Sequence, residues 1–389
     1  MSDEFLQDYQ FFRQKGCFPP DLLPNSNSNL ELKVTRLSGL TNNVFKIEVP
    51  GLDIPFVYHK FSNNFKLLID HSFENNVIKK LSENRLYVEI FYADNEQRIE
   101  KFYPGLPIDL KEFQDFAILK GLLFQLSYIH SNLFGTMSNK DNDFLLDKIT
   151  KKPDFLKLLS CEIEKRMEFL SEEKKSKLLN IYHEVLGIDY QLKLETFLKK
   201  LKNIQEIYEI PLDLYYVMCH NDLNNTNILI KENKNPLSLR VIDYEYSSPN
   251  YLVYEFANLF NEFATDYSYP QAPYFHYDTS KYPDIDFRMK FFLIYCFYHK
   301  IWKNKQKETV YFEMEFNENQ PTKEDFAQIA KEYGNVIKGL EEGTFYASVF
   351  SHYFWFIVAG LSLNMKDLGI DLYEYIIMRY EILKKTLFE

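Results

Sequence analysis

The chain has 389 residues, enough for two lobes that each bury a core of their own. Hydrophobic residues make up 46% of the chain and aromatic residues 17%, which excludes an intrinsically disordered protein. The formal net charge of -11 argues against non-specific nucleic-acid binding, because that binding needs clustered Lys and Arg.

Cysteine spacing and hydropathy exclude further classes of protein. The four cysteines are far apart, and neither CxxC nor HExxH occurs, so neither a disulfide framework nor a zinc site is indicated. The first residues, MSDEFLQDYQ, are acidic and polar, unlike a signal peptide, and the apolar run around Tyr353 to Leu363 is too short to span a membrane. We therefore expect a cytoplasmic protein without membrane insertion.

The N-terminal third predicts a small sheet and one helix. A short helix and a Pro/Asn/Ser loop are expected in residues 1–29, and the alternation from Leu32 to Val49 predicts two strands joined by the turn LSGLTNN. Ile54 to Phe61 predicts the next strand. Within it His59 and Lys60 are adjacent, so they face opposite sides of the sheet unless a bulge intervenes.

A helix should follow this strand, in the segment DHSFENNVIKKLSE. Glu74 lies beside its apolar face, although a solvated surface position explains this residue equally well. The segment RIEKFYPGLP then predicts a strand ended by Pro104 and Gly105, a natural hinge between lobes. Helical spacing resumes from Leu110 to His130 and again in residues 139–203, to which we assign no chemistry.

The most informative stretch runs from His220 to Tyr246 and contains HNDLNNTNILI and RVIDYEY. It predicts a strand hairpin with acidic residues at its mouth. Asp222 and Asn227 are five positions apart, the separation of base and Mg²⁺-binding Asn in the kinase catalytic loop, and Asp243 follows where a second metal ligand is needed. We predict phosphoryl transfer. The alternative is a polar turn between strands, whose Asn and Asp side chains bond to their own backbone.

The segment after the hairpin predicts a helix rich in aromatic residues. Glu255, Asn258 and Glu262 fall on one face of that helix, and solvent exposure of the face is the plain alternative to a site. Residues 303–324 form a largely polar tract that predicts a surface excursion. Two helices are expected at the end of the chain, from Tyr346 to Leu363 and from Leu372 to Leu387.

The segments CHNDLNNTNILI and VIDYEYSSPNY resemble the choline/ethanolamine kinase family, and the resemblance extends into RLSGLTNNVF, RIEKFYPGLPIDLKEF and ASVFSHYFWFIVAGLSL. It implies an α+β, two-lobed protein-kinase-like fold. The smaller lobe, an antiparallel sheet plus a helix, would be residues 1–104, and the larger, mostly helical lobe residues 105–389.

The resemblance also implies an activity, with cofactors and partners. A choline kinase would use ATP and Mg²⁺ to make phosphocholine, the first step of phosphatidylcholine synthesis, and would be a homodimer. The alternatives are an ethanolamine kinase and a catalytically weak nucleotide-binding module of the same fold. A protein kinase is disfavoured, because HND lacks the Arg of HRD, IDYE replaces DFG and no APE follows.

The implied site residues fall into four groups. Asp222 would be the base or hydroxyl-orienting carboxylate and would act with Asn227 and Asp243. The implied metal ligands are Asn227, Asp243 and Glu245. The implied ATP-binding residues are Ser38, Gly39, Leu40, Thr41, Asn42, His59, Lys60, Glu74, Lys101, Phe102, Tyr103, Asn224 and Asp243. The implied choline-binding residues are Asp222, Tyr246, Glu262, Tyr267, Trp355 and Tyr375.

Several positions depart from the family pattern. His59 stands where the family has a phosphate-binding Arg, which leaves the choice between His59 and Lys60 open. Leu252 replaces an Arg, and Glu255 replaces an Asp. Val358 replaces the second Trp of an aromatic cage, a cage that suits choline because N(CH₃)₃⁺ has no N–H to donate.

The substrate remains open between two branches of the family. DYxY and KYP are typical of the choline kinase branch, whereas DYEY and NEFA are typical of the ethanolamine kinase branch. Trp355 and Tyr375 could also be ordinary core aromatics.

Overall fold

The computed structural model describes residues 33–37, 42–51, 54–62, 65–134, 153–233, 235–305, 312–365 and 368–389. Three predictions lie outside these residues: the helix in residues 1–29, the nucleotide contacts of residues 38–41, and the middle of the polar tract. The chain divides into two compact units, and the boundary lies between Gly105 and Leu106. Each unit is described by itself.

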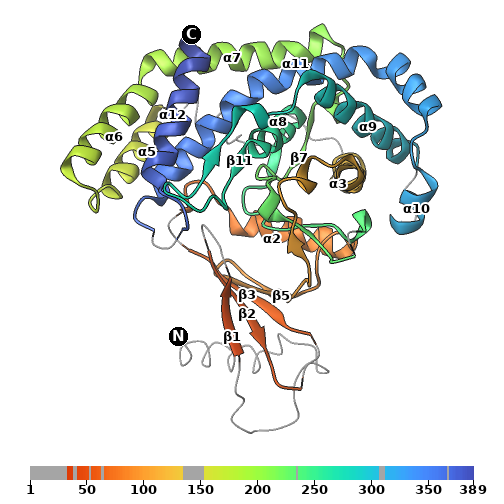
Figure 1. The fold of residues 1–389 in the computed structure, drawn as a ribbon, viewed down its shortest axis with the longest axis horizontal. Coiled ribbons are helices and arrows are strands. Elements are labelled where there is room, and N and C mark those ends of the chain that lie inside the picture. Colours follow the sequence, from red (N-terminus) through yellow and green to blue (C-terminus); the bar gives the residue numbers. More distant parts are fainter. Residues whose placement is uncertain are drawn as a thin grey trace. The chain divides into compact units, whose positions relative to one another are not determined.

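The first unit is built on a five-stranded antiparallel sheet with the strand order β1-β2-β3-β5-β4 (Figure 1). Its elements are β1 Lys33–Leu37, β2 Asn43–Glu48, β3 Phe56–Lys60, α2 His71–Glu83, β4 Ile90–Ala93 and β5 Gln97–Lys101. The helix α2 begins where the Asp70 side chain accepts the N–H of Phe73, and it buries Val77, Ile78 and Leu81. The expected strands and helix are confirmed.

The second unit is mostly helical (Figure 1). Its helices are α3 Phe116–Tyr128, α5 Pro153–Lys165, α6 Glu172–Val185, α7 Ile188–Ile207, α8 Leu252–Phe263, α9 Ile285–Asn304, α10 Phe312–Glu318, α11 Lys323–Ser362 and α12 Leu372–Phe388. Its short strands are β6 Leu106–Pro107, β7 Tyr216–Cys219, β8 Ile228–Ile230, β9 Arg240–Val241, β10 Ser248–Tyr251, β11 Thr265–Asp266 and β12 His276–Tyr277. The α+β fold is confirmed.

Helix α11 is the centre of this unit and packs against α7, α8, α9 and α12. It has 40 residues and starts much earlier than the sequence predicts, at a capping box made by Thr322 and Asp325. By length and composition it is the one described helix that could cross a membrane, but 83% of its apolar window is buried inside the protein. Because a core helix passes the same test, this is weak evidence for a span.

Short strands place the predicted loop. β7 pairs with β10, and β8 pairs with β9 so that Ile228 is opposite Val241. The backbone N–H of Ile242 donates to the carbonyl of Asn227, which closes the mouth of the hairpin. The predicted hairpin is confirmed, and α8 follows directly after β10.

Candidate active site

The carboxylate of Asp222 is held in one orientation by two side-chain amides. The Nδ2 groups of Asn224 and Asn227 donate to its two oxygens at 3.0 and 2.8 Å. Asn224 is itself fixed, because its Oδ1 accepts the N–H groups of Thr226 and Asn227 at the start of a 3-10 turn. Asp222 is therefore a buried carboxylate with a fixed orientation, while Asn224 also makes the local backbone bonds that the polar-turn alternative expects.

The electrostatics of this site favour proton uptake by Asp222. Burial raises the pKa of the Asp222 carboxyl well above its ordinary value, and the charges of Asp243 and Glu262 raise it further. The hydrogen bonds from Asn224 and Asn227 act in the opposite direction. A carboxylate with a raised pKa is a stronger proton acceptor, as a general base for a hydroxyl group requires.

Glu255 anchors the loop that carries Asp222. Its two oxygens accept the backbone N–H groups of His220 and Asn221, both at 2.8 Å. The side chain is fully buried, and burial raises the pKa of Glu255 to about 7, although the two N–H bonds lower it. Glu255 is thus a backbone anchor of the loop that carries Asp222, a role that sequence reasoning missed.

His220 ties the two ends of the hairpin together. Its Nδ1 accepts the N–H of Asp222 at 3.2 Å, and its Nε2 donates to the carbonyl of Ile242 at 2.8 Å. Asp243, which follows Ile242, has a φ of 65°, a left-handed conformation that is uncommon for residues other than glycine. Such backbone strain occurs at sites where a side chain must be aimed.

The mouth of the hairpin offers oxygen ligands. The Nδ2 of Asn227 is used on Asp222, so its Oδ1 is the atom that can face a cation, as can the carboxylate of Asp243. The described residues contain no cluster of three or more His, Cys, Asp and Glu side chains that could hold a metal. Two protein oxygens plus phosphate and water suit Mg²⁺, and the residues therefore fit that ion. The metal role of the buried Glu245 stays a prediction.

The polar face of α8 is buried, so the solvent-exposed alternative is wrong. Glu255, Asn258 and Glu262 are all exposed by 3% or less. The Oδ1 of Asn258 accepts the indole N–H of Trp355 at 2.8 Å, and its Nδ2 donates to the carbonyl of Leu223 at 3.3 Å. One amide thus joins Trp355 to the catalytic loop.

Glu262 is paired with Arg379, a fully buried cation of α12 that the sequence reasoning missed. The guanidinium lies 3.0 Å from Glu262 Oε1, donates to the Tyr375 hydroxyl and lies 2.8 Å from His352 Nδ1. Tyr267 donates to the other oxygen of Glu262 at 2.8 Å. Three of the predicted substrate residues, Glu262, Tyr267 and Tyr375, therefore belong to one network.

The aromatic residues form two ring groups. Trp355 contacts Tyr246 edge to face at 5.6 Å between centroids. Tyr375 contacts Phe275 at 5.4 Å and Tyr267 at 6.4 Å. Val358 is only 1% exposed, so a larger side chain would overpack the core there instead of simply adding a wall.

The first unit contains a buried charge network around Glu74, and the solvated alternative for this residue is wrong. Glu74 accepts from Arg98 of β5 at 2.6 Å, and Arg98 also donates to Glu100 at 2.8 Å. His59 lies 3.1 Å from Glu100, whereas Lys60 is exposed on the other face of β3. Burial alone would raise the pKa of Glu100, but the charges of His59 and Arg98 lower it to about 2. Sequence reasoning missed Arg98.

The other nucleotide predictions concern the backbone. The N–H groups of Lys101 and Phe102 donate to the carbonyls of Glu89 and Pro55 at 2.9 and 3.0 Å. Asn42 accepts the N–H of Ser62 at 3.1 Å. Contacts of Asn42, Lys101, Phe102 and Tyr103 with a nucleotide stay predictions.

A family model described as choline/ethanolamine kinase matches residues 34–384. The chain belongs to the choline/ethanolamine kinase family. The members that give this family its name are phosphotransferases that act on an alcohol group.

Two curated relatives represent the two branches of this family, the choline kinases and the ethanolamine kinases. Choline kinase alpha of Mus musculus is 28% identical over 216 residues, which are 52% of this chain and 41% of the relative. Ethanolamine kinase of Saccharomyces cerevisiae is 28% identical over 311 residues, 72% of this chain and 55% of the relative. The chain thus matches about half of the length of each, and identity does not choose a branch.

A solved relative confirms the fold. The crystal structure of choline kinase from Cryptosporidium parvum matches with a TM-score of 0.63 and 22% identity, covering 94% of this chain and 92% of that chain. At this identity the likeness shows the protein-kinase-like architecture alone.

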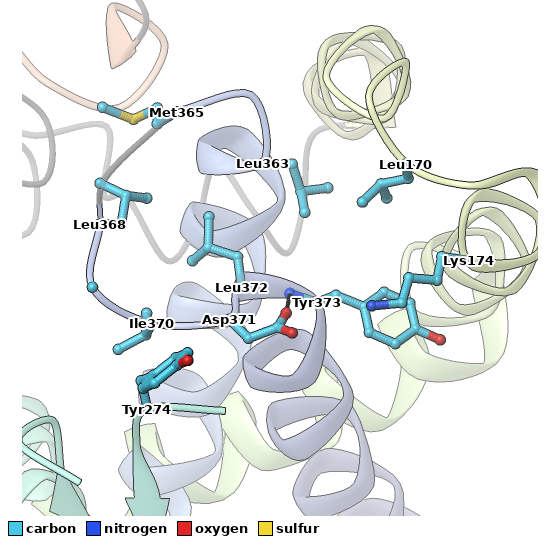
Figure 2. Close-up of a pocket in the computed structure, with 11 residues that line it drawn as sticks. Leu170, Lys174, Tyr274, Leu363, Met365, Leu368, Ile370, Asp371, Leu372 and Tyr373 are labelled. Atoms are coloured by element: carbon cyan, nitrogen blue, oxygen red, sulfur yellow. Dashed lines mark hydrogen bonds between the residues drawn. The ribbon is translucent and has the colours of Figure 1, made fainter. Parts of the chain in front are cut away.

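A separate cavity of about 620 Å³ lies beside the N-terminal end of α12 (Figure 2). Half-buried apolar side chains from the segment between α11 and α12 line it, together with Leu170 and Tyr274. Its two charged side chains are engaged, because Asp371 caps α12 and Lys174 lies 4.3 Å above the Tyr373 ring. None of the predicted site residues lines this cavity.

Proposed function

We propose that this chain transfers the γ-phosphoryl group of ATP to the hydroxyl of choline or ethanolamine. The observation that carries the proposal is the buried Asp222 carboxylate, fixed by Asn224 and Asn227 at the mouth of a hairpin that continues into Asp243. Phosphoryl transfer needs positioning and charge stabilisation rather than covalent work by the protein.

Each polar residue at the hairpin has a role in that reaction. Asp222 would accept a hydrogen bond from the substrate hydroxyl and take up its proton as that oxygen bonds to the γ-phosphorus and the bond from the γ-phosphorus to the ADP oxygen breaks. Asn227 and Asp243 would hold Mg²⁺ through oxygen atoms, and the ion would neutralise charge on the β- and γ-phosphates. Glu255 and His220 would keep the loop in the geometry that the transfer requires.

The ammonium end of the substrate would lie among the rings. Choline, the acceptor favoured by the sequence resemblance, is supported by the contact between Trp355 and Tyr246, whose ring faces can attract a cation. Ethanolamine is supported by the polar network of Glu262, Tyr267 and Tyr375. A homodimer stays a prediction of the resemblance.

The test is an acceptor screen with the purified chain. ADP release is followed with ATP and Mg²⁺ while choline, ethanolamine and an aminoglycoside are offered separately, and phosphorus NMR identifies the phosphate ester. We expect acceptor-dependent ADP release with one or both amino alcohols. Release that is the same without an acceptor, or that occurs only with the aminoglycoside, would refute the assignment.

A further inference from the structure

The side chain of Asn221 joins the catalytic loop to the segment that follows the hairpin. Its Nδ2 donates to the carbonyl of Tyr246 at 2.9 Å and to the hydroxyl of Ser248 at 2.8 Å. Its Oδ1 accepts from the Nδ2 of Asn250 at 2.8 Å. Asn221 is only 1% exposed, so water competes little for these bonds. One buried amide therefore holds the two segments together.

The backbone of Asn221 restricts which residue type can occupy this position. Its φ is 68°, in the left-handed region that Asn, Asp and Gly tolerate best. Its N–H donates to Glu255 at 2.8 Å, which holds the backbone in this conformation. Of those three residue types, Asn alone has a side-chain N–H donor. The position therefore requires both a left-handed backbone and an amide, and Asn221 supplies both.

Two consecutive residues of the catalytic loop hold the two ends of the segment 243–245, which contains two of the predicted metal ligands. His220 donates to the carbonyl immediately before this segment at 2.8 Å. Asn221 donates to the carbonyl of Tyr246, immediately after it. Asp222 follows Asn221 directly in the chain. The two bonds thus fix the segment that would bind Mg²⁺ relative to the carboxylate that would act on the substrate hydroxyl.

Phosphoryl transfer is sensitive to this separation. Mg²⁺ demands near-octahedral oxygen geometry, and ligands on a loosely held segment satisfy that geometry poorly. A displacement of about 1 Å between reacting groups can cost about 10²-fold in rate. A residue that holds the ligand segment can therefore control metal affinity without touching the ion.

We propose that Asn221 is a positioning residue that sets the separation between the Asp222 carboxylate and the Mg²⁺ ligands of the segment 243–245. This role rests on the proposed function, because it concerns the metal of the same reaction. Asn221 itself contacts neither substrate nor metal in this role, since its N–H donors are used on Tyr246 and Ser248. Loss of the amide would leave every reacting group present and would release the segment that carries the metal ligands.

Gln191 of α7 provides the matched control, because it is also a buried amide with two bonds inside the same unit. Its Nε2 donates to the carbonyl of Val185 at 3.2 Å and to the hydroxyl of Tyr353 at 2.9 Å, and the residue is 8% exposed. None of these three residues belongs to the predicted site. Loss of either amide should lower the free energy of unfolding, but only loss of the Asn221 amide should weaken metal binding.

The first measurement titrates ADP release with Mg²⁺ at fixed ATP in the wild type, Asn221→Gly, Ser248→Ala and Gln191→Ala. Glycine keeps the left-handed backbone and removes only the amide. Asn221→Gly should raise the Mg²⁺ concentration for half-maximal activity about 3- to 30-fold and change the KM for the amino alcohol less than about twofold. Ser248→Ala removes one acceptor of the amide and should give a smaller rise. Gln191→Ala should leave the Mg²⁺ requirement unchanged.

A second measurement needs neither metal nor turnover. Amide hydrogen exchange is followed by mass spectrometry in the metal-free protein, and peptides that cover residues 243–250 are compared with peptides from α9. Asn221→Gly should speed exchange in residues 243–250 several-fold relative to α9, whereas Gln191→Ala should not.

Wild-type values in either measurement for a folded Asn221→Gly would overturn the inference. An equal rise of the Mg²⁺ requirement in Gln191→Ala would also overturn it, because the effect would then follow stability alone. If Asn221→Gly does not fold, Ser248→Ala decides, and wild-type values for that variant in either measurement count against the role. Turnover of neither amino alcohol by the wild type would refute the proposed function instead, while the exchange comparison would still test whether Asn221 holds the segment.

Discussion

The ion pair between Glu262 and Arg379 gives the sharpest prediction for stability. Arg379→Met removes a fully buried guanidinium and its contacts with Glu262, Tyr375 and His352. The variant leaves the Glu262 carboxylate buried without its cation, and removal of one partner of a buried pair costs about 3 to 5 kcal/mol. Glu262→Gln leaves the opposite charge buried and should cost about 3 kcal/mol.

The double variant separates pairing from packing. If each single loss is mainly an uncompensated charge, the double variant, which buries neither charge, should lose less stability than either single variant, a coupling of about 3 kcal/mol or more. Urea unfolding at constant m-value measures the four free energies. As a control, Lys165→Met at the exposed pair with Glu162 should leave the urea midpoint of unfolding unchanged. Additive losses in the double variant would refute the pairing.

Three further predictions concern phosphate, metal and pH. His59→Ala should raise the KM for ATP several-fold, whereas Lys60→Ala should change it less than about twofold. The reason is that His59 belongs to the Glu100 network, while Lys60 is on the exposed face of β3. A larger effect of Lys60→Ala would assign the phosphate contact to Lys60. Asp243→Asn should raise the Mg²⁺ concentration for half-maximal activity at least tenfold, because a neutral amide replaces an anionic ligand. An unchanged Mg²⁺ requirement would mean that Asp243 is not a metal ligand. Burial raises the pKa of Glu255 from 4.5 to about 7, so the folded protein keeps a proton that the unfolded chain releases. The stability advantage of the wild type over Glu255→Gln should therefore fall by up to about 3 kcal/mol between pH 4.5 and pH 7.5, and a pH-independent difference would exclude this titration.

Local pattern was sufficient where the determinants are local. Alternation predicts β1 to β3, and the buried stripe of Val77, Ile78 and Leu81 predicts α2. The hairpin between Ile228 and Val241 follows from two apolar runs around a polar tract. The spacing of Asp222 and Asn227 likewise predicted that this carboxylate and this amide lie together, and they are hydrogen-bonded in the structure.

Two buried ion pairs could not be predicted from the sequence, because their partners meet only in the tertiary structure. An Arg is usually placed on the surface, and nothing in the order of residues shows that Arg98 and Arg379 are buried against Glu74 and Glu262. The available signal for that pair was the position of Arg379 four residues after Tyr375, which puts it on the buried face of α12.

Glu255 was hidden for a related reason. It anchors backbone N–H groups more than thirty residues earlier in the chain, a contact that no local pattern encodes.

The central claim is that Asp222 orients and deprotonates the hydroxyl of an amino alcohol. The most direct measurement is steady-state ADP release with the better of the two amino alcohols, compared between the wild type and Asp222→Asn, alongside nucleotide binding measured by calorimetry. We predict that Asp222→Asn binds ATP and Mg²⁺ with near-normal affinity and loses turnover by about 10²-fold or more. Turnover of Asp222→Asn within a few-fold of the wild type would contradict the claim.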